Sequence, residues 1–214
     1  WTLKANFGGG SRYGAAGFSI GNKGYIGTGG GGYVDFWEYD PGTSLAVSAG
    51  WNPVSFPKVP PVSISDVLAD VSANVKLIWD WDNQNQTWRK WTPSGAGSNT
   101  LASLETGKGY WVYMDAPGII DVDGWQWPQS TTIALSEGWN LVGYLGTENA
   151  TVTTGLNAIS NKWSVVWSWT NGLWYGKHIT ISGLPQPIQP LTNFNRGRAY
   201  WIKVKMGQAG NWTQ

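Results

Sequence analysis

Three blocks of sequence occur twice in the same order, and this duplication constrains the fold more than any other feature. LAVSAGWNPVSFP at 45–57 matches IALSEGWNLVGYL at 133–145, VKLIWDWDNQNQTW at 75–88 matches SVVWSWTNGLW at 164–174, and LASLETGKGYWVYM at 101–114 matches LTNFNRGRAYWIKV at 191–204. Trp51 and Trp139 lie 88 residues apart, as do Trp79 and Trp167, and Trp111 and Trp201 lie 90 apart. This regular spacing predicts two copies of one structural unit, which we place at 44–124 and 125–209.

Each copy has the pattern of β-strands. In LIWDWD at 77–82, Leu77 and two tryptophans alternate with Ile78 and two aspartates, which is typical of a strand with two different faces. The polar runs NQNQ and NG that follow in the two copies predict hairpin turns. One short helix per copy is expected, at 63–71 with Ser65 as its cap and, more weakly, at 153–159.

Tryptophan is unusually abundant, with 17 residues in a chain of 214. Ten of them occupy matched positions in the two copies, and we interpret most of these as core residues, because a residue kept in both copies most simply fills the same interior position twice. Trp91, Trp125 and Trp127 are unmatched. Exposed indoles with polar neighbours can stack on sugar rings, so these three are candidate carbohydrate ligands. Alternatively, Trp125 and Trp127 cover the junction between the two copies.

The duplicated stretch resembles a module of secreted and surface proteins of archaea and bacteria. The pattern GWNL near the start and GYWI near the end appears as GWNPV at 50–54, GWNLV at 138–142, GYWV at 109–112 and AYWI at 199–202. The resemblance covers residues 43–206, with Pro53 in place of the usual Leu and Ala199 in place of the usual Gly. It implies an extracellular or cell-surface location and assigns no chemistry.

The first 43 residues have a different pattern. RYGAAGFSIGNKGYIGTGGGG at 12–32, followed by DFWEYDP at 35–41, resembles a bacterial kelch repeat, the blade of a β-propeller. The resemblance implies a strand from Gly14 to Ile20, a turn at 22–24 and a glycine pair within 29–32. In that family a Trp follows the Tyr across the last turn, but no Trp follows Tyr39 at that distance.

The end of the chain offers a replacement for this missing strand. Joining Thr43 to Asn211 gives EYDPGT-NWTQ, which restores the blade ending. We therefore expect residues 1–43 and 210–214 to form one split blade with the duplicated module inserted at its outer hairpin, because loop tips tolerate insertions. In this interpretation Asp40-Pro41-Gly42 forms a tight turn, and Asn211–Gln214 is the partner strand of 35–39.

A single blade leaves strand edges unpaired. The chain could be a piece of a longer protein, the blade could pack on the inserted module, or copies could associate head to tail by strand completion. The residues expected in such assembly strands are Trp1, Thr2, Leu3, Lys4, Asn211, Trp212, Thr213 and Gln214.

Composition argues against several classes of chemistry. The formal net charge is +1, which gives no electrostatic footprint for nucleic acid. The chain has no cysteine and one histidine, His178, so thiolate and multi-histidine metal sites are excluded. No apolar run approaches the roughly 18 residues of a membrane span. The carboxylate pairs Asp80/Asp82, Asp121/Asp123 and Glu38/Asp40 have the pattern of solvated strand or turn residues, so no catalytic residue, metal or cofactor is expected.

The combined expectation is an all-β protein: a kelch-like antiparallel blade with an inserted two-repeat β module and at most one short helix per repeat. We expect a non-catalytic extracellular surface or structural protein that contacts itself or other surface proteins through β-strand edges. The alternative is a carbohydrate-binding module that uses Trp91, Trp125 and Trp127.

Overall fold

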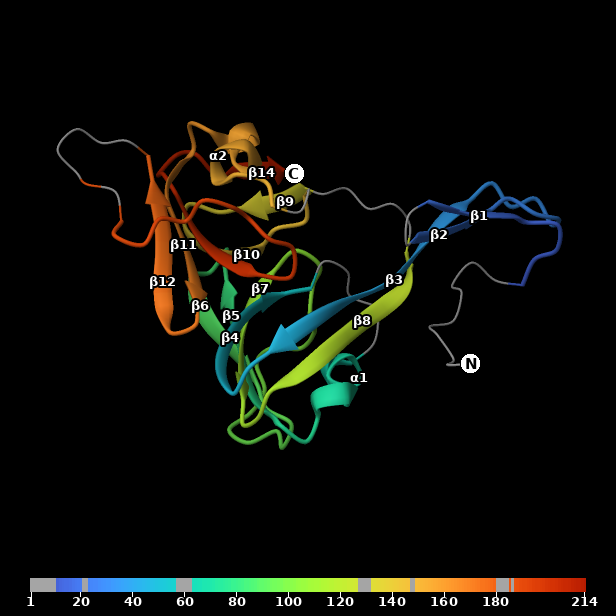
Figure 1. The fold of residues 1–214 in the computed structure, drawn as a ribbon, viewed down its shortest axis with the longest axis horizontal. Helices are drawn as coiled ribbons and strands as arrows, with labels where there is room; N and C mark the ends of the chain where they lie inside the picture. The colour runs from blue at the N-terminus through green and yellow to red at the C-terminus, as the bar shows by residue number, and fades with distance from the viewer. Residues whose placement is uncertain are drawn as a thin grey trace.

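The computed structural model describes residues 11–20, 23–56, 63–126, 132–146, 149–179, 185 and 187–214. These residues form antiparallel strands and four short helical turns, which confirms the all-β fold class (Figure 1). The expected closing strand Trp1–Lys4 lies outside the described residues.

The first repeat is a four-stranded sheet with a helical crossover. Its strands β4 (Gly50–Ser55), β5 (Val75–Asp82), β6 (Thr87–Trp91) and β7 (Gly109–Met114) are arranged in the order β4-β7-β5-β6. The connection between β4 and β5 contains α1 (Ile64–Val67) and η1 (Ala69–Val71). A capping box begins α1, in which the Ser63 hydroxyl accepts a bond from the Asp66 N–H and the Asp66 carboxylate accepts one from the Ser63 N–H. The helix expected here is confirmed, but its cap is Ser63 and not Ser65.

The second repeat has the same architecture. Its strands β10 (Gly138–Gly143), β11 (Trp163–Thr170), β12 (Leu173–His178) and β13 (Ala199–Val204) are arranged in the order β10-β13-β11-β12. Its crossover contains α2 (Val152–Gly155) and η2 (Asn157–Ile159). The predicted duplication is therefore a structural repeat, and both predicted hairpins form.

Each sheet covers its own hydrophobic core with one face. Ile78, Tyr110 and Val112 are fully buried in the first core, and Val166, Tyr200 and Ile202 in the second. The buried tyrosines are held alike, because each hydroxyl accepts a bond of 2.7 Å from a backbone N–H five residues earlier. The two cores thus repeat in hydrogen bonding as well as in shape.

A short ribbon closes each core. In the second repeat β9 (Thr132–Leu135) pairs with β14 (Gly210–Thr213), so that Ile133 lies opposite Trp212. In the first repeat the inner ends of β3 (Phe36–Val47) and β8 (Gly118–Gln126) take this place, with Leu45 opposite Ile120. Trp212 and Ile120 are both fully buried. The last strand of the chain is therefore the last strand of the second repeat.

Two expectations about the split blade are wrong. Strand β3 pairs with β2 and β8, so Asn211–Gln214 is not the partner of residues 35–39. The reason is the Trp212 side chain, which is buried in the second core and donates its Nε1–H to the Gly155 carbonyl at 2.7 Å. Residues Asp40-Pro41-Gly42 also make no turn, since β3 runs through them with a shift of register between Asp40 and Thr43, and bulges in strands accommodate Pro.

The Gly-rich front of the chain forms a protruding arm. Strands β1 (Ala16–Ile20) and β2 (Lys23–Gly27) extend the outer half of the β3–β8 ribbon in the order β1-β2-β3-β8 (Figure 1). The loop after β2 needs its glycines, because Gly29 and Gly31 have φ of 115° and 106°, which side chains disfavour. The predicted antiparallel ribbon is confirmed in this segment.

Candidate functional site: a tryptophan groove between the repeats

The ten matched tryptophans lie on the sheet faces opposite to the cores. On β5, Ile78 and Asp80 are fully buried against the core, whereas Trp79 and Trp81 point to the other face and stay partly exposed. Strand β11 repeats this arrangement. The expectation that most of these ten side chains fill the cores is wrong, because aliphatic residues and tyrosine from the opposite face already fill them.

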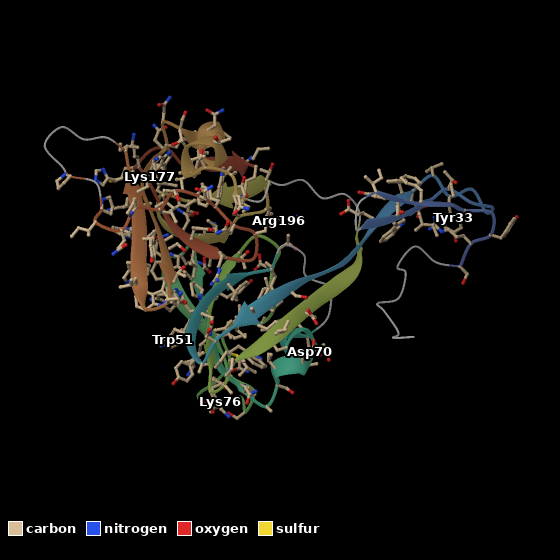
Figure 2. The ribbon with its side chains drawn as sticks, viewed as in Figure 1. Tyr33, Trp51, Asp70, Lys76, Lys177 and Arg196 are labelled. Carbon is tan, nitrogen blue, oxygen red and sulfur yellow. The ribbon has the colours of Figure 1, made fainter. Side chains whose placement is uncertain are left out.

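The two tryptophan faces meet and line a groove. Two adjoining depressions have volumes of about 650 and 580 Å³ and share Trp88, Trp174 and Trp201. Among the described residues only tryptophans line them: Trp51, Trp79, Trp81, Trp88, Trp111, Trp139, Trp167, Trp169, Trp174 and Trp201. These are the ten matched tryptophans, and we call this surface the tryptophan groove. Trp51, marked at the surface of the first repeat in Figure 2, is 42% exposed.

Indole pairs within the groove obey an approximate twofold relation. Trp81 and Trp88 pack edge to face at 5.2 Å between ring centroids, as do their counterparts Trp169 and Trp174. Across the junction, the ring centroids of Trp81 and Trp201 lie 5.8 Å apart, and those of the equivalent pair, Trp169 and Trp111, lie 6.3 Å apart. Edge-to-face aromatic pairs are favourable, so the indoles both join the repeats and line the depressions.

Few polar atoms reach the surface of the groove. The Trp81 Nε1–H donates to the Trp139 carbonyl at 2.9 Å. For the other nine indole N–H groups, the structure shows no acceptor among the described residues. The groove therefore offers a ligand mainly indole ring faces, because its surface is almost wholly apolar.

Backbone hydrogen bonds join the two repeats next to the groove. The Ser55 N–H donates to the Gly197 carbonyl at 3.0 Å, and the equivalent Gly143 N–H donates to the Gly107 carbonyl at 2.8 Å. Ser55 and Gly143 hold equivalent positions in the two repeats and lie against each other, since a Cβ on Gly143 would be 1.6 Å from the Ser55 Oγ. This contact marks the pseudo-twofold axis.

The tryptophans predicted as carbohydrate ligands are not part of this groove. Trp91 is buried in the first core with 9% exposure, so the expectation that it is an exposed stacking residue is wrong. The backbone of Trp125 lies in β8, while its side chain and the whole of Trp127 lie outside what the structure describes. The groove was not predicted, because residues repeated in both copies were interpreted as buried.

The titratable groups whose pKa is clearly shifted include Asp80 and His178, neither of which lines the groove. Asp80 is fully buried on the core face of β5, where it pairs with Arg89 and lies 3.8 Å from the Lys108 Nζ. Burial raises the pKa of its carboxyl, against the lowering effect of the two cations. The ring nitrogens of His178 face the carbonyls of Ile179 and Pro185, and these bonds raise its pKa.

Two further features are absent from the described residues. These residues contain no group of three or more His, Cys, Asp or Glu side chains that could hold a metal ion. No helix among them has the length and apolar character needed to cross a membrane.

The chain was also compared with known proteins. No protein family, curated protein or solved structure matches it at a significant level.

Proposed function

We propose that this chain is a non-catalytic binding protein of the cell surface or extracellular space, acting through protein–protein contacts, and that its tryptophan groove holds a proline-rich segment of a partner. One observation carries the proposal: ten tryptophans, repeated in two units, gather at a single junction without being buried. Exposed apolar patches of this kind usually mark interaction sites, and tryptophan is enriched among binding hot spots.

The chemistry of the groove favours an extended proline-rich segment. Such a segment adopts polyproline II, has no internal hydrogen bonds, and presents carbonyl acceptors without matching N–H donors. The groove offers such a segment an almost wholly apolar surface of indole rings, whose faces can take prolyl rings. Aromatic-lined grooves are a recurring solution for recognising such segments.

Titration with decaproline, followed by tryptophan fluorescence and calorimetry, tests this proposal. We expect saturable binding, and we expect Trp174→Ala to weaken it about tenfold or more, because Trp174 lines both depressions and hot-spot truncations cost this much. Trp91→Phe, which changes a buried tryptophan outside the groove, is the matched control and should leave affinity unchanged. Absence of binding, or equal affinity in Trp174→Ala, would refute the proposal.

A carbohydrate ligand is the second candidate, favoured by the exposed ring faces of Trp51, Trp88 and Trp174. Sugar hydroxyls are donors as well as acceptors, so a sugar site normally adds polar acceptors that the groove lining lacks. Cellohexaose in the same titration separates the two. Binding of cellohexaose without binding of decaproline would replace the peptide proposal by the carbohydrate one.

The arm is a second contact surface that we propose for self-association. Phe18, Tyr25 and Phe36 stack along it at 5.2 and 5.6 Å, and Phe18 and Ile20 are 49% and 63% exposed. Sedimentation velocity should show concentration-dependent association that the double variant Phe18→Ser/Phe36→Ser abolishes, whereas Tyr13→Ser, an exposed tyrosine on the same arm, should not. A strict monomer at high concentration would rule out this contact and assembly through strand edges alike.

A further inference from the structure

A polar pocket adjoins the tryptophan groove at one of its ends. Its volume is about 340 Å³, and it shares Trp51 and Trp169 with the groove. The remaining wall is mostly small or polar and includes Pro53, Asn171 and Arg198. Under the pseudo-twofold relation, the corresponding place at the other end lies beside Trp139, and there the chain fills it with its own hairpin loop.

The filled end shows what chemistry the position accepts. Gln86, in the loop between β5 and β6, donates its Nε2–H to the Trp139 carbonyl at 2.8 Å and accepts from the Trp139 N–H at 3.1 Å. One primary carboxamide thus satisfies both backbone groups of a single residue on the edge strand β10. The neighbouring Leu141 N–H donates to the Asn83 side-chain oxygen at 2.9 Å.

Trp51 presents the same two backbone groups. It lies on the edge strand β4, opposite Tyr113, as Trp139 lies on β10 opposite Lys203. Along an edge strand, the backbone N–H and C=O groups of every second residue point away from the sheet. Ser55 and Gly143 have this direction, because their N–H groups bond to the other repeat, and Trp51 lies four residues before Ser55 as Trp139 lies four before Gly143. The Trp51 N–H and C=O therefore face the polar pocket, where no group among the described residues bonds them.

The loop lengths explain why this end is open. Six residues separate Trp81 from Trp88, but only four separate Trp169 from Trp174. The shorter loop carries no glutamine that could reach across. Pro53 stands where the other repeat has Leu141, and its missing N–H prevents a complete strand from adding to this edge. The Trp51 N–H and C=O therefore remain as one donor and one acceptor, which a small bidentate group can satisfy.

We infer that this pocket binds the side-chain carboxamide of a glutamine in the partner polypeptide, next to the segment held in the tryptophan groove. A primary amide carries a donor and an acceptor on the same side, as Gln86 shows. A carboxylate lacks the donor, and a trans secondary amide points its two groups in opposite directions. The inference deepens the proposed function and rests on it for the identity of the ligand as a polypeptide.

The first arm of the test uses propanamide as the probe and the backbone amide resonance of Trp51 as the readout. We expect a saturable shift at millimolar concentrations, and none with N,N-dimethylpropanamide, which has no N–H. Replacing residues 170–172 with the sequence DNQNQ of 82–86 supplies an internal glutamine and should abolish the propanamide shift. The same graft ending in Ala, DNQNA, leaves the pocket open and should restore it.

The second arm compares two proline-rich peptides that differ only in a central Gln or Glu. The Gln peptide should bind about tenfold more tightly, and the DNQNQ graft should remove this difference while decaproline binding persists. A Trp51 shift that is absent, or equal with the dimethyl compound, overturns the inference. A propanamide shift without any peptide binding upholds the pocket and rejects the proposed function, whereas peptide binding with no preference for Gln rejects the inference alone.

Discussion

The free energy of unfolding of the variant Trp212→Ala is expected to be about 3–5 kcal/mol lower than that of the natural chain, as is typical for removal of a large buried aromatic side chain. Trp212 is fully buried, packs on Tyr144 and Phe194, and donates its indole N–H to the Gly155 carbonyl. The loss combines the cavity in the second core with a carbonyl left unpaired. Urea unfolding followed by far-UV circular dichroism measures it.

Two further variants isolate the cause. Trp212→Phe keeps most of the ring but removes the donor, so it should cost less than Trp212→Ala. Asn211→Ala changes an exposed neighbour on the same strand and should alter stability by no more than about 0.5 kcal/mol. If Trp212→Ala proved as stable as Asn211→Ala and only changed self-association, the last strand would be an assembly strand, not a part of the second core.

The variant Gly143→Ser should lower the stability of the fold nearly as much as Trp212→Ala. A Cβ at this position would lie 1.6 Å from the Ser55 Oγ and 2.4 Å from its Cβ, at the axis where the repeats meet. Ser55 is fully buried, so the clash can be relieved only by moving the repeats apart. We expect a loss of about 3 kcal/mol, at the upper end of overpacking effects, together with altered tryptophan fluorescence from the displaced groove. Urea unfolding checks the first result and emission spectra the second.

The pseudo-twofold relation predicts a rescue. Because residues 55 and 143 are equivalent, the double variant Ser55→Gly/Gly143→Ser moves the same side chain to the other side of the axis. It should recover most of the lost stability, leaving a deficit of about 1 kcal/mol, as for volume-conserving exchanges. Ser55→Gly alone completes the double-mutant cycle. A double variant no more stable than Gly143→Ser would show that the two residues do not face each other.

The sequence predicted the repeats, strands and hairpins well, because these follow from local alternation. It did not predict which sheet face is buried. Trp79 and Trp81 alternate with Ile78 and Asp80, and hydrophobicity alone places the tryptophans inside. In the fold, Ile78 and Asp80 face the core, since each repeat already has enough aliphatic residues to fill it. Which face is free depends on packing between repeats, and periodicity does not encode that.

The last strand shows a different limit. Trp212 corresponds to Ile120 in the first repeat, but GNWT and GIID share only their glycine. The stronger resemblance to a blade ending therefore misdirected the pairing. Strand partners far apart in the chain are chosen by burial of side chains such as Trp212, which outweighs a short motif.

The open pocket beside Trp51 was visible in the sequence only as a difference in loop length. The loop between Trp169 and Trp174 is two residues shorter than the loop between Trp81 and Trp88. The consequence is seen only in the structure, where Gln86 of the longer loop bonds to the Trp139 backbone. No local rule places a loop of one repeat on the edge strand of the other.

The most direct test of the tryptophan groove is fluorine NMR of the fluorotryptophan-labelled chain during the decaproline titration. We predict that resonances of groove tryptophans such as Trp51, Trp88 and Trp174 shift together with one affinity, while those of the buried Trp163 and Trp212 stay in place. Shifts confined to tryptophans outside the groove, or no shift in the groove set at saturating peptide, would contradict the assignment of this surface as the binding site.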